Sequence, residues 1–272
     1  MRRNFAQVLR EGKIDIKNEY SKLYAAFYGK ASHDGKSMAD IISANFTEFY
    51  FRGTCLSLEE FDKTYGFHFT EQPQNFSIDY LVSFCEYVFN FIARSDDRFF
   101  WAAFDKRSYI DHIHRVIEAI GYMQSSEDGF VIFVPKDNVA VSVAESGIIP
   151  DRISYKVIAY NHHSMKGDLE GKRQTLLMFA DLLEPKRDEL EAVDKKFASD
   201  LFYVFNNFNI RHNNIDPAGP KYKKPVGDLT SEQLESWYDE AYQMCLLAFM
   251  RLEHVPRKQA FDMLKDRIEN KE

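Results

Sequence analysis

The chain has 272 residues, of which 45% are hydrophobic and 15% aromatic, so it is long enough for two domains that each bury a core. Only 12 Gly and 8 Pro accompany 24 Phe and 15 Tyr, which favours long regular elements, mainly helices, and excludes a disordered chain. The formal net charge of -7 excludes a general nucleic-acid-coating role, because nucleic acid would bind only at a local basic patch.

The cysteines and the apolar runs indicate where such a protein works. Cys55, Cys85 and Cys245 lie far apart in apolar or aromatic surroundings, which is typical of buried thiols in a reducing compartment. Residues 1–5 are basic but lack the apolar core of a secretory signal that would follow them. No apolar run approaches the roughly 20 residues that span a bilayer. We therefore expect a cytoplasmic protein without a membrane partner.

The first part of the chain is predicted to form helices followed by a β-hairpin. Apolar residues at helical spacing indicate helices over residues 16–28, 38–53, 57–66, 77–92 and 110–120. Ser57 with Glu60 forms a capping box, and Ser77 caps a strongly apolar helix that is central to the first domain. Asp128-Gly129 between two β-prone runs predicts the hairpin. Residues 99–101, Phe-Phe-Trp, are either core or a partner-binding patch.

A helix that leads into a two-stranded ribbon is the outline of a winged helix-turn-helix. The recognition helix would carry His112, His114 and Arg115, but also Asp111 and Glu118, which repel phosphates. A winged-helix DNA-binding regulator is therefore one function hypothesis, and a plain packing domain is its alternative.

The glycine- and proline-containing segment over residues 146–171 predicts a hinge, and we place the domain division near residue 150. The domains are then residues 1–150, helical with a terminal winged hairpin, and residues 151–272, a helical bundle. In the second domain, Pro185 should interrupt a helix over residues 176–190, and a further helix covers residues 193–208. Thr230 and Gln233 form a capping box for the next helix, and Pro256 should open a last one.

The candidate site lies between the helix over residues 193–208 and the loop that follows it. Arg211 stays charged and His212 exchanges protons near neutral pH, a pair that suits phosphodiester binding or cleavage. Four Arg or Lys residues stand against one acid, Asp216, between Phe205 and Gly227. An RNA backbone would be attracted there, with Arg211 and His212 as catalytic candidates. The RNA-binding candidates are Asn207, Asn213, Asn214, Lys221, Tyr222, Lys223 and Lys224.

An architectural interpretation stands beside the functional one. In it the Asn residues cap the helix and fix the loop, and Arg211 pairs with a carboxylate of a neighbouring helix. No metal site or cofactor is expected, because adjacent His162-His163 and alternate His112 and His114 seldom share an ion. Glycine-rich phosphate loops and a Gly-x-Ser-x-Gly elbow are absent from the sequence.

Residues 172–269 resemble a HEPN-type domain of the kind found in bacterial abortive-infection and toxin proteins. The resemblance consists of two helices, a polar motif headed by Arg211-His212-Asn213, a loop and two more helices. The family's second motif His is replaced here by the stretch from Ile215 to Ala218, so only Arg211 carries over. The resemblance implies a homodimer whose polar motifs face each other, and metal-independent RNA cleavage.

The leading hypothesis is a prokaryotic defence protein whose carboxy-terminal module binds and cuts RNA through Arg211, with His212 moving the proton and Asn207 and Asn214 positioning the substrate. A second hypothesis is a non-catalytic dimeric module that bridges a partner protein. The winged-helix regulator is the third.

Overall fold

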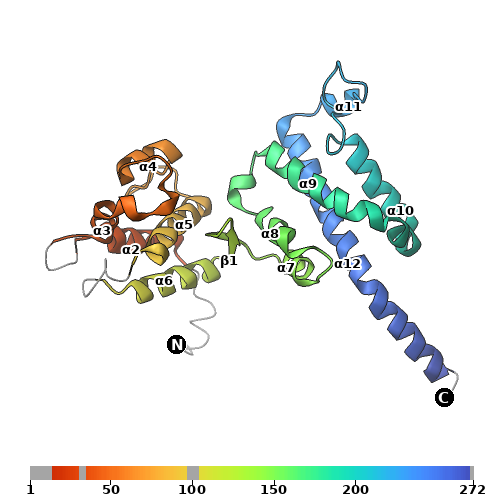
Figure 1. Ribbon diagram of the computed structural model, residues 1–272, viewed down its shortest axis with the longest axis horizontal. Helices are drawn as coiled ribbons and strands as arrows, with labels where there is room; N and C mark the ends of the chain where they lie inside the picture. The colour runs from red at the N-terminus through yellow and green to blue at the C-terminus, as the bar shows by residue number, and fades with distance from the viewer. Residues whose placement is uncertain (1–13, 31–34, 97–103, 270–272) are drawn as a thin grey trace, which may run out of the picture. The chain divides into compact units, whose positions relative to one another are not determined.

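The computed structural model describes residues 14–30, 35–96 and 104–269 (Figure 1). It is mainly α-helical with one two-stranded antiparallel sheet, which confirms the fold class predicted from the sequence. Residues 1–5 and 99–101, for which the sequence made predictions, lie outside the described residues. Among those that are described, no helix combines the length and the apolarity needed to cross a bilayer.

The chain forms two compact units, Met1–Lys136 and Asp137–Glu272. The division lies earlier than the predicted one near residue 150. The reason is that α7 (Asn138–Glu145) packs against α8 (Asp151–Ala159), and its buried Ala140 and Val143 belong to the second core. The glycine-rich segment that suggested a hinge is therefore internal to the second unit.

The described residues of the first unit form five α-helices, and their ends follow local capping chemistry. Ser57 and Ser77 each accept a hydrogen bond of 3.1 Å from a backbone N–H of the first turn, and Gly66 ends its helix in the left-handed conformation with φ 76°. These ends agree with the sequence. The helices are α2 (Ile16–Tyr28), α3 (Met38–Ala44), α4 (Leu58–Tyr65), α5 (Ile78–Arg94) and α6 (Lys106–Ala119).

The predicted helix over residues 38–53 is wrong in its second half. α3 ends at Ala44, and two short 3₁₀ turns, Phe46–Glu48 and Tyr50–Arg52, follow it. The side-chain amide of Asn45 donates to the carbonyl of Ile41 over 2.8 Å, which satisfies an end carbonyl of the helix.

Aromatic rings form the core of the first unit around α5. Phe84 is fully buried, and its ring centroid lies 5.1 Å from those of Tyr20 and Phe69. Such edge-to-face contacts add to the free energy gained from burying the rings. Cys55 and Cys85 are buried free thiols in this unit, and burial raises the pKa of Cys85.

The hairpin pairs β1 (Tyr122–Glu127) with β2 (Phe130–Pro135). Asp128 and Gly129 both adopt positive φ, 50° and 81°, as a two-residue primed turn requires, so the predicted turn is confirmed. The side chain of Asn90 in α5 donates to the carbonyl of Val131 and accepts from its N–H, over 2.8 and 2.9 Å. Two hydrogen bonds therefore hold strand β2 against α5.

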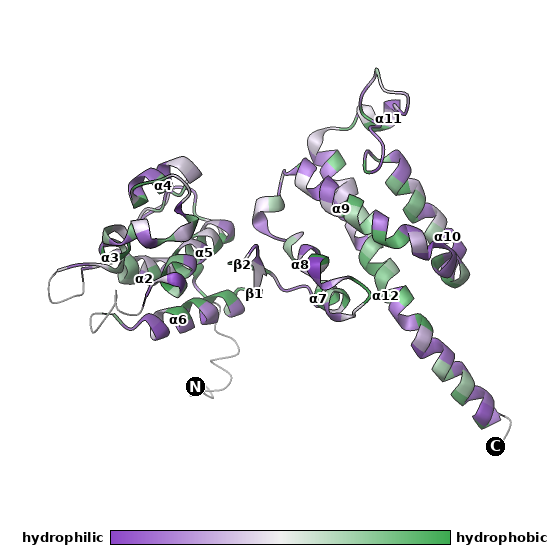
Figure 2. Cartoon of the chain, viewed as in Figure 1, coloured by the Kyte–Doolittle hydropathy of each residue, from purple (hydrophilic) through white to green (hydrophobic). Residues whose placement is uncertain are grey.

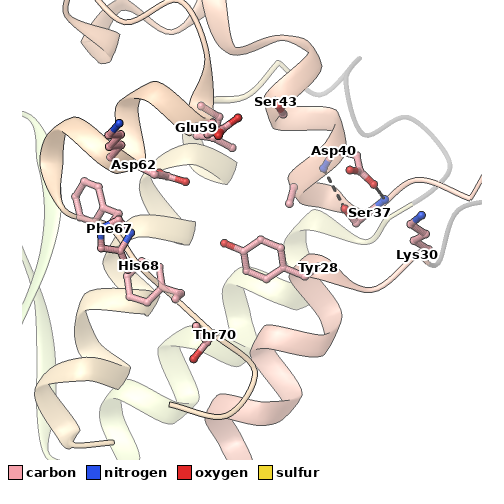
Figure 3. Close-up of a pocket in the computed structure, with 14 residues that line it drawn as sticks. Tyr28, Lys30, Ser37, Asp40, Ser43, Glu59, Asp62, Phe67, His68 and Thr70 are labelled. Atoms are coloured by element: carbon pink, nitrogen blue, oxygen red, sulfur yellow. Dashed lines mark hydrogen bonds between the residues drawn. The ribbon is translucent and has the colours of Figure 1, made fainter. Parts of the chain in front are cut away.

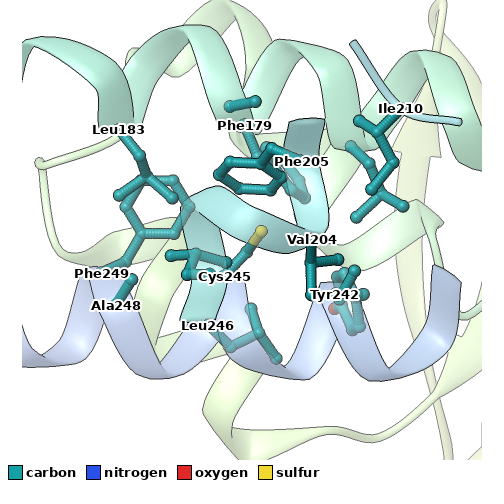
Figure 4. Close-up of a cluster of buried hydrophobic side chains, with 14 of the residues drawn as sticks. Phe179, Leu183, Val204, Phe205, Ile210, Tyr242, Cys245, Leu246, Ala248 and Phe249 are labelled. Carbon is teal, nitrogen blue, oxygen red and sulfur yellow. The ribbon is translucent and has the colours of Figure 1, made fainter. Parts of the chain in front are cut away.

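The second unit packs α9 (Leu169–Leu183) and α10 (Arg187–Asn207) against α12 (Ser231–Glu269). Figure 4 shows Phe179 and Leu183 of α9 in one buried cluster with Phe205 of α10 and with Cys245 and Phe249 of α12. A short helix, α11 (Lys224–Gly227), lies in the loop between α10 and α12.

Pro185 and Asp194 interrupt the helices of this unit, whereas Pro256 does not. Pro185 lies in a 3₁₀ turn, Glu184–Lys186, so the predicted interruption is confirmed. α10 is also broken at Asp194, where φ is -155°, and Arg251 of α12 donates to that carboxylate over 2.7 Å. The prediction that Pro256 opens a separate helix is wrong, because α12 continues through it. One proline removes one backbone hydrogen bond and does not by itself end a helix.

Candidate functional site

Arg211 is held against the end of a neighbouring helix. Its Nη1 donates to the carboxylate of Glu184, and its Nη2 donates to the carbonyl of Ala180 over 2.9 Å. The guanidinium carbon lies 5.7 Å from the ring centroid of Phe205, and the side chain is 17% exposed. Ala180 is in the last turn of α9, where an arginine satisfies end carbonyls and opposes the negative end of the helix dipole.

Asn209 and Asn214 fix the loop that follows α10. The backbone N–H of Asn209 donates to Oδ1 of Asn214 over 2.9 Å, and the backbone N–H of Asn214 donates to Oδ1 of Asn209 over 3.3 Å. Nδ2 of Asn214 donates to the carbonyl of Lys221 over 2.8 Å, and Asn214 is fully buried. Asn209 has φ 57°, a conformation that Asn tolerates better than most residues. Asn214, predicted to contact RNA, therefore stabilises the loop from inside.

The other two candidate asparagines also bond to the backbone. Nδ2 of Asn207 donates to the carbonyl of Tyr203 over 2.9 Å, and Oδ1 of Asn213 accepts from the N–H of Asp216 over 3.2 Å. These contacts favour the architectural interpretation of the Asn residues. Asn209, which the sequence did not single out among the candidates, is central to the arrangement; its signal is an Asn directly after a helix end.

The lysines of the loop are exposed. Lys221, Lys223 and Lys224 all lie at the surface, and the part of the chain that the structure describes shows no ion pair for any of them. His212 is partly exposed beside Arg211. The two members of the expected pair therefore differ: Arg211 is bound to Glu184, whereas His212 is partly exposed and shows no bond to Arg211.

Two aromatic side chains border this loop. The ring of Tyr222 lies against Gly227, where an added Cβ would come within 2.7 Å of the ring, so part of the ring is used in loop packing. Phe208, the residue that ends α10, contacts Trp237 of α12 with 5.0 Å between ring centroids. Trp237 is 42% exposed. These contacts connect the loop to the first turns of α12.

A buried lysine forms a second ionic clamp in this unit. Nζ of Lys172 lies 2.7 Å from Glu235 and 2.6 Å from Asp239, both on α12. The hydroxyl of Tyr160 donates to Asp239 over 3.0 Å, and hydrogen bonding to Lys172 lowers the pKa of Glu235. A cavity of about 260 Å³ borders the clamp. Lys172 is 5% exposed, so its charge is compensated inside the fold.

A larger cavity, of about 690 Å³, lies on the first unit (Figure 3). Residues from α2, α3, α4 and the segment over residues 67–70 line it, and Tyr28 and Asp62 face it from opposite sides. Its volume is within the range of about 300–1,000 Å³ that is usual for small-molecule sites. The sequence did not predict this cavity, because its lining residues come from four separate segments.

Asp62 is a lining residue whose pKa is moved toward neutrality. Burial raises its pKa to about 6, against opposing effects of a hydrogen bond from Tyr87 and of the charge of His68. The Tyr87 hydroxyl donates to Oδ1 over 2.9 Å. A carboxyl group with this pKa exchanges a proton near neutral pH, as a general acid or base does. Nothing in the sequence around Asp62 marks it, because Tyr87 lies on another helix.

The remaining lining residues combine aromatic rings with charges of both signs. Phe67 and Phe69 supply apolar surface, and Glu59, Lys30 and Lys63 supply charge. Asp40 also lines the cavity, but its carboxylate accepts the N–H of Ser37 over 2.9 Å in a capping box.

The histidines of the predicted recognition helix make contacts within the first unit. Nε2 of His112 lies 3.1 Å from Glu19 of α2, and Nε2 of His114 lies 2.8 Å from Oε1 of Gln124 in β1. Arg115 is exposed between exposed Asp111 and Glu118. Because exposed carboxylates flank Arg115, this surface gives the winged-helix hypothesis little support.

The fold and these sites define a mainly helical protein of two units, one with a cavity lined by aromatic and charged side chains and one with a lysine-rich loop. No protein-family model, curated protein or solved structure matches the chain at a significant level. The resemblance to HEPN domains therefore stays a prediction.

Proposed function

We propose that the second unit binds RNA through the loop over residues 212–224, with Arg211 and the asparagines holding the loop in shape. The observation that supports the proposal is the exposure of Lys221, Lys223 and Lys224 on a backbone that buried Asn214 fixes. A role in prokaryotic defence of the abortive-infection type, which the HEPN resemblance suggests, is part of the same proposal.

The charge distribution supports binding of a phosphate backbone. The chain as a whole carries -7, whereas this loop presents three lysines without a carboxylate partner in the described structure. A loop already fixed by hydrogen bonds loses little conformational entropy when it binds. Lysine contacts phosphates without reading bases, so binding should depend on salt and little on sequence.

The test is anisotropy of a labelled single-stranded RNA over a range of salt concentrations. Three phosphate contacts predict a slope of about -2 for log K against log salt. The double variant Lys223→Ala/Lys224→Ala should bind more weakly with a shallower slope. Lys195→Ala/Lys196→Ala, an exposed lysine pair on α10, is the matched control and should bind like the wild type. Equal binding by both double variants would contradict the proposal, and a DNA oligonucleotide of the same sequence tests for a preference for RNA.

Cleavage requires a different state of Arg211. Its donors are occupied by Glu184 and Ala180, so we propose binding without cleavage. RNA should stay intact with wild-type protein in chelator. If the wild type cuts RNA and Arg211→Ala or His212→Ala abolishes that cleavage, the catalytic hypothesis for the substituted residue is restored.

The cavity of the first unit favours a second candidate function, binding of a small aromatic zwitterion. Asp62 would meet the cation, Lys30 or Lys63 the anion, and Phe67 and Phe69 the apolar body. Phenylalanine is the probe, and phenethylamine and phenylpropionate, which each lack one charge, are its controls. In calorimetric titration, phenylalanine should bind best, and Asp62→Asn should remove that advantage. Equal heats from all three probes would exclude this function.

A further inference from the structure

The last part of α12 leaves the core of its unit. Buried residues occur along α12 up to Leu252, and none of its described residues beyond that point is buried. Figure 1 shows the end of α12 extending past the other helices of its unit, and Figure 2 shows hydrophobic residues recurring along it. Four large apolar side chains there are 53–69% exposed: Phe261, Met263, Leu264 and Ile268.

Three of these four belong to a stripe with alternating spacings of three and four residues. The stripe begins on the outer side of the packed part of α12, where Leu247 and Met250 are 41% and 39% exposed. This spacing keeps side chains on one face and is the pattern of a helix-to-helix seam. The complete stripe is Leu247, Met250, His254, Arg257, Phe261, Leu264 and Ile268.

An uncovered helix of this kind is poorly stabilised. Isolated helices of about 12–15 residues are marginal in water, and most helices in proteins are stabilised by packing of an apolar face. Over residues 253–269 three of the five stripe positions are apolar, Phe261, Leu264 and Ile268, and no described residue covers them. A partner that covers the stripe would stabilise both the apolar side chains and the helix.

We propose that the stripe is a dimer seam and that its occupant is the same stripe of a second copy, running antiparallel. The segment over residues 253–269 carries four basic and four acidic residues, so its balanced charge attracts neither nucleic acid nor an anionic membrane. The basic residues are Arg257, Lys258, Lys265 and Arg267, and the acidic ones are Glu253, Asp262, Asp266 and Glu269.

Side-chain complementarity favours the antiparallel arrangement. A pair centred between Arg257 and Phe261 places each Arg257 over the Phe261 ring of the other copy, a cation–π contact. It also places Met250 opposite Ile268 and Glu253 opposite Arg267. A parallel pair would place the two Arg257 guanidinium groups against each other. This seam differs from the polar-motif interface that the HEPN resemblance implies, and it does not depend on RNA binding.

Sedimentation of the full chain at several concentrations tests the seam. The wild type should be a dimer, and Leu264→Asp should raise the dissociation constant at least about a hundredfold, because it places two carboxylates in the seam. Met263→Asp is the matched control, because Met263 is also exposed, at 64% against 53% for Leu264, but lies off the stripe; this variant should stay dimeric. At concentrations low enough for the wild type to be monomeric, both variants should keep its melting temperature, since neither side chain is buried in the monomer.

A monomeric wild type at every concentration would overturn the proposal, and so would equal behaviour of the two variants. Orientation is tested with cysteines under oxidising conditions. Met250→Cys/Ile268→Cys should form a covalent dimer, whereas Leu264→Cys should not, because an antiparallel copy places His254 opposite it. Efficient cross-linking of Leu264→Cys would overturn the antiparallel arrangement.

Discussion

The two units differ in how far the charges of their notable polar side chains are compensated by neighbouring groups. In the second unit Lys172, Arg211 and Asn214 each bond to partners of the same unit, so their polar groups are satisfied and serve the architecture. In the first unit the half-buried carboxylate of Asp62 is held by the neutral hydroxyl of Tyr87, and its pKa is raised to about 6. A conspicuous polar cluster in a sequence is therefore a weaker guide to chemistry than one carboxylate whose surroundings leave its charge uncompensated.

Removal of a core ring should have the largest effect and tests whether the units are independent. Phe84→Ala leaves a cavity in the aromatic core and should destabilise the first unit by about 3–5 kcal/mol. Calorimetry should then show one of two transitions shifted downwards. Phe179→Ala, in the core of the second unit, should shift the other transition. If either variant shifts both transitions equally, the two units unfold as one.

The second largest effect is expected for Asn214, which is fully buried in the second unit. Asn214→Ala leaves the N–H of Asn209 and the carbonyl of Lys221 without their partners and should destabilise the second unit by about 2–3 kcal/mol. Asn213→Ala, next to it but exposed, should cost less than about 0.5 kcal/mol in the same urea unfolding experiment. Similar losses for the two variants would show that the loop is not held from inside.

Asp62 should make the stability of the first unit depend on pH. Its pKa rises from 3.8 to about 6 on folding, so the folded chain binds a proton more tightly between these values. The free energy of unfolding is therefore higher in acid and falls as the pH rises through about 6. Asp62→Asn should remove this fall and add about 1–2 kcal/mol at neutral pH, after allowance for solvent screening. Urea unfolding below and above pH 6 measures this pH dependence. Parallel pH profiles of the unfolding free energy for wild type and variant would disprove the role of Asp62.

The helix caps should give the smallest effects, similar in the two units. Thr230 and Gln233 exchange hydrogen bonds of 2.9 and 3.2 Å at the start of α12, and Ser57 accepts from Glu60 at the start of α4. Thr230→Ala and Ser57→Ala should each cost about 1 kcal/mol. A loss for Thr230→Ala as large as that for Asn214→Ala would mean that the cap also fixes the loop before it.

Features set by neighbouring residues were predictable from the sequence. The caps at Ser57, Ser77 and Thr230 and the turn at Asp128-Gly129 depend on groups a few residues apart, and all are present in the structure. The helix end at Ala44 and the continuation of α12 through Pro256 were missed. There, a single side-chain contact or the rest of the helix outweighed the local propensity.

The candidate site depends on distant partners, which the sequence does not reveal. Arg211 bonds to Glu184 and Ala180 on another segment, and the sequence left open whether it would pair with a carboxylate or face a substrate. Asn213 and Asn214 are adjacent and identical, yet one is exposed and the other fully buried. Asp62 is perturbed by burial, a property of the whole fold.

The contact between Trp237 and Phe208 gives the second unit a natural optical reporter. The chain has only two tryptophans, Trp101 and Trp237, so Trp101→Phe would leave one indole emitter. That indole is partly open to water and lies against Phe208, the residue at the end of α10 from which the chain leads to the lysine-bearing loop. A change in its emission wavelength would record the arrival of a ligand at the loop in real time, without any attached dye.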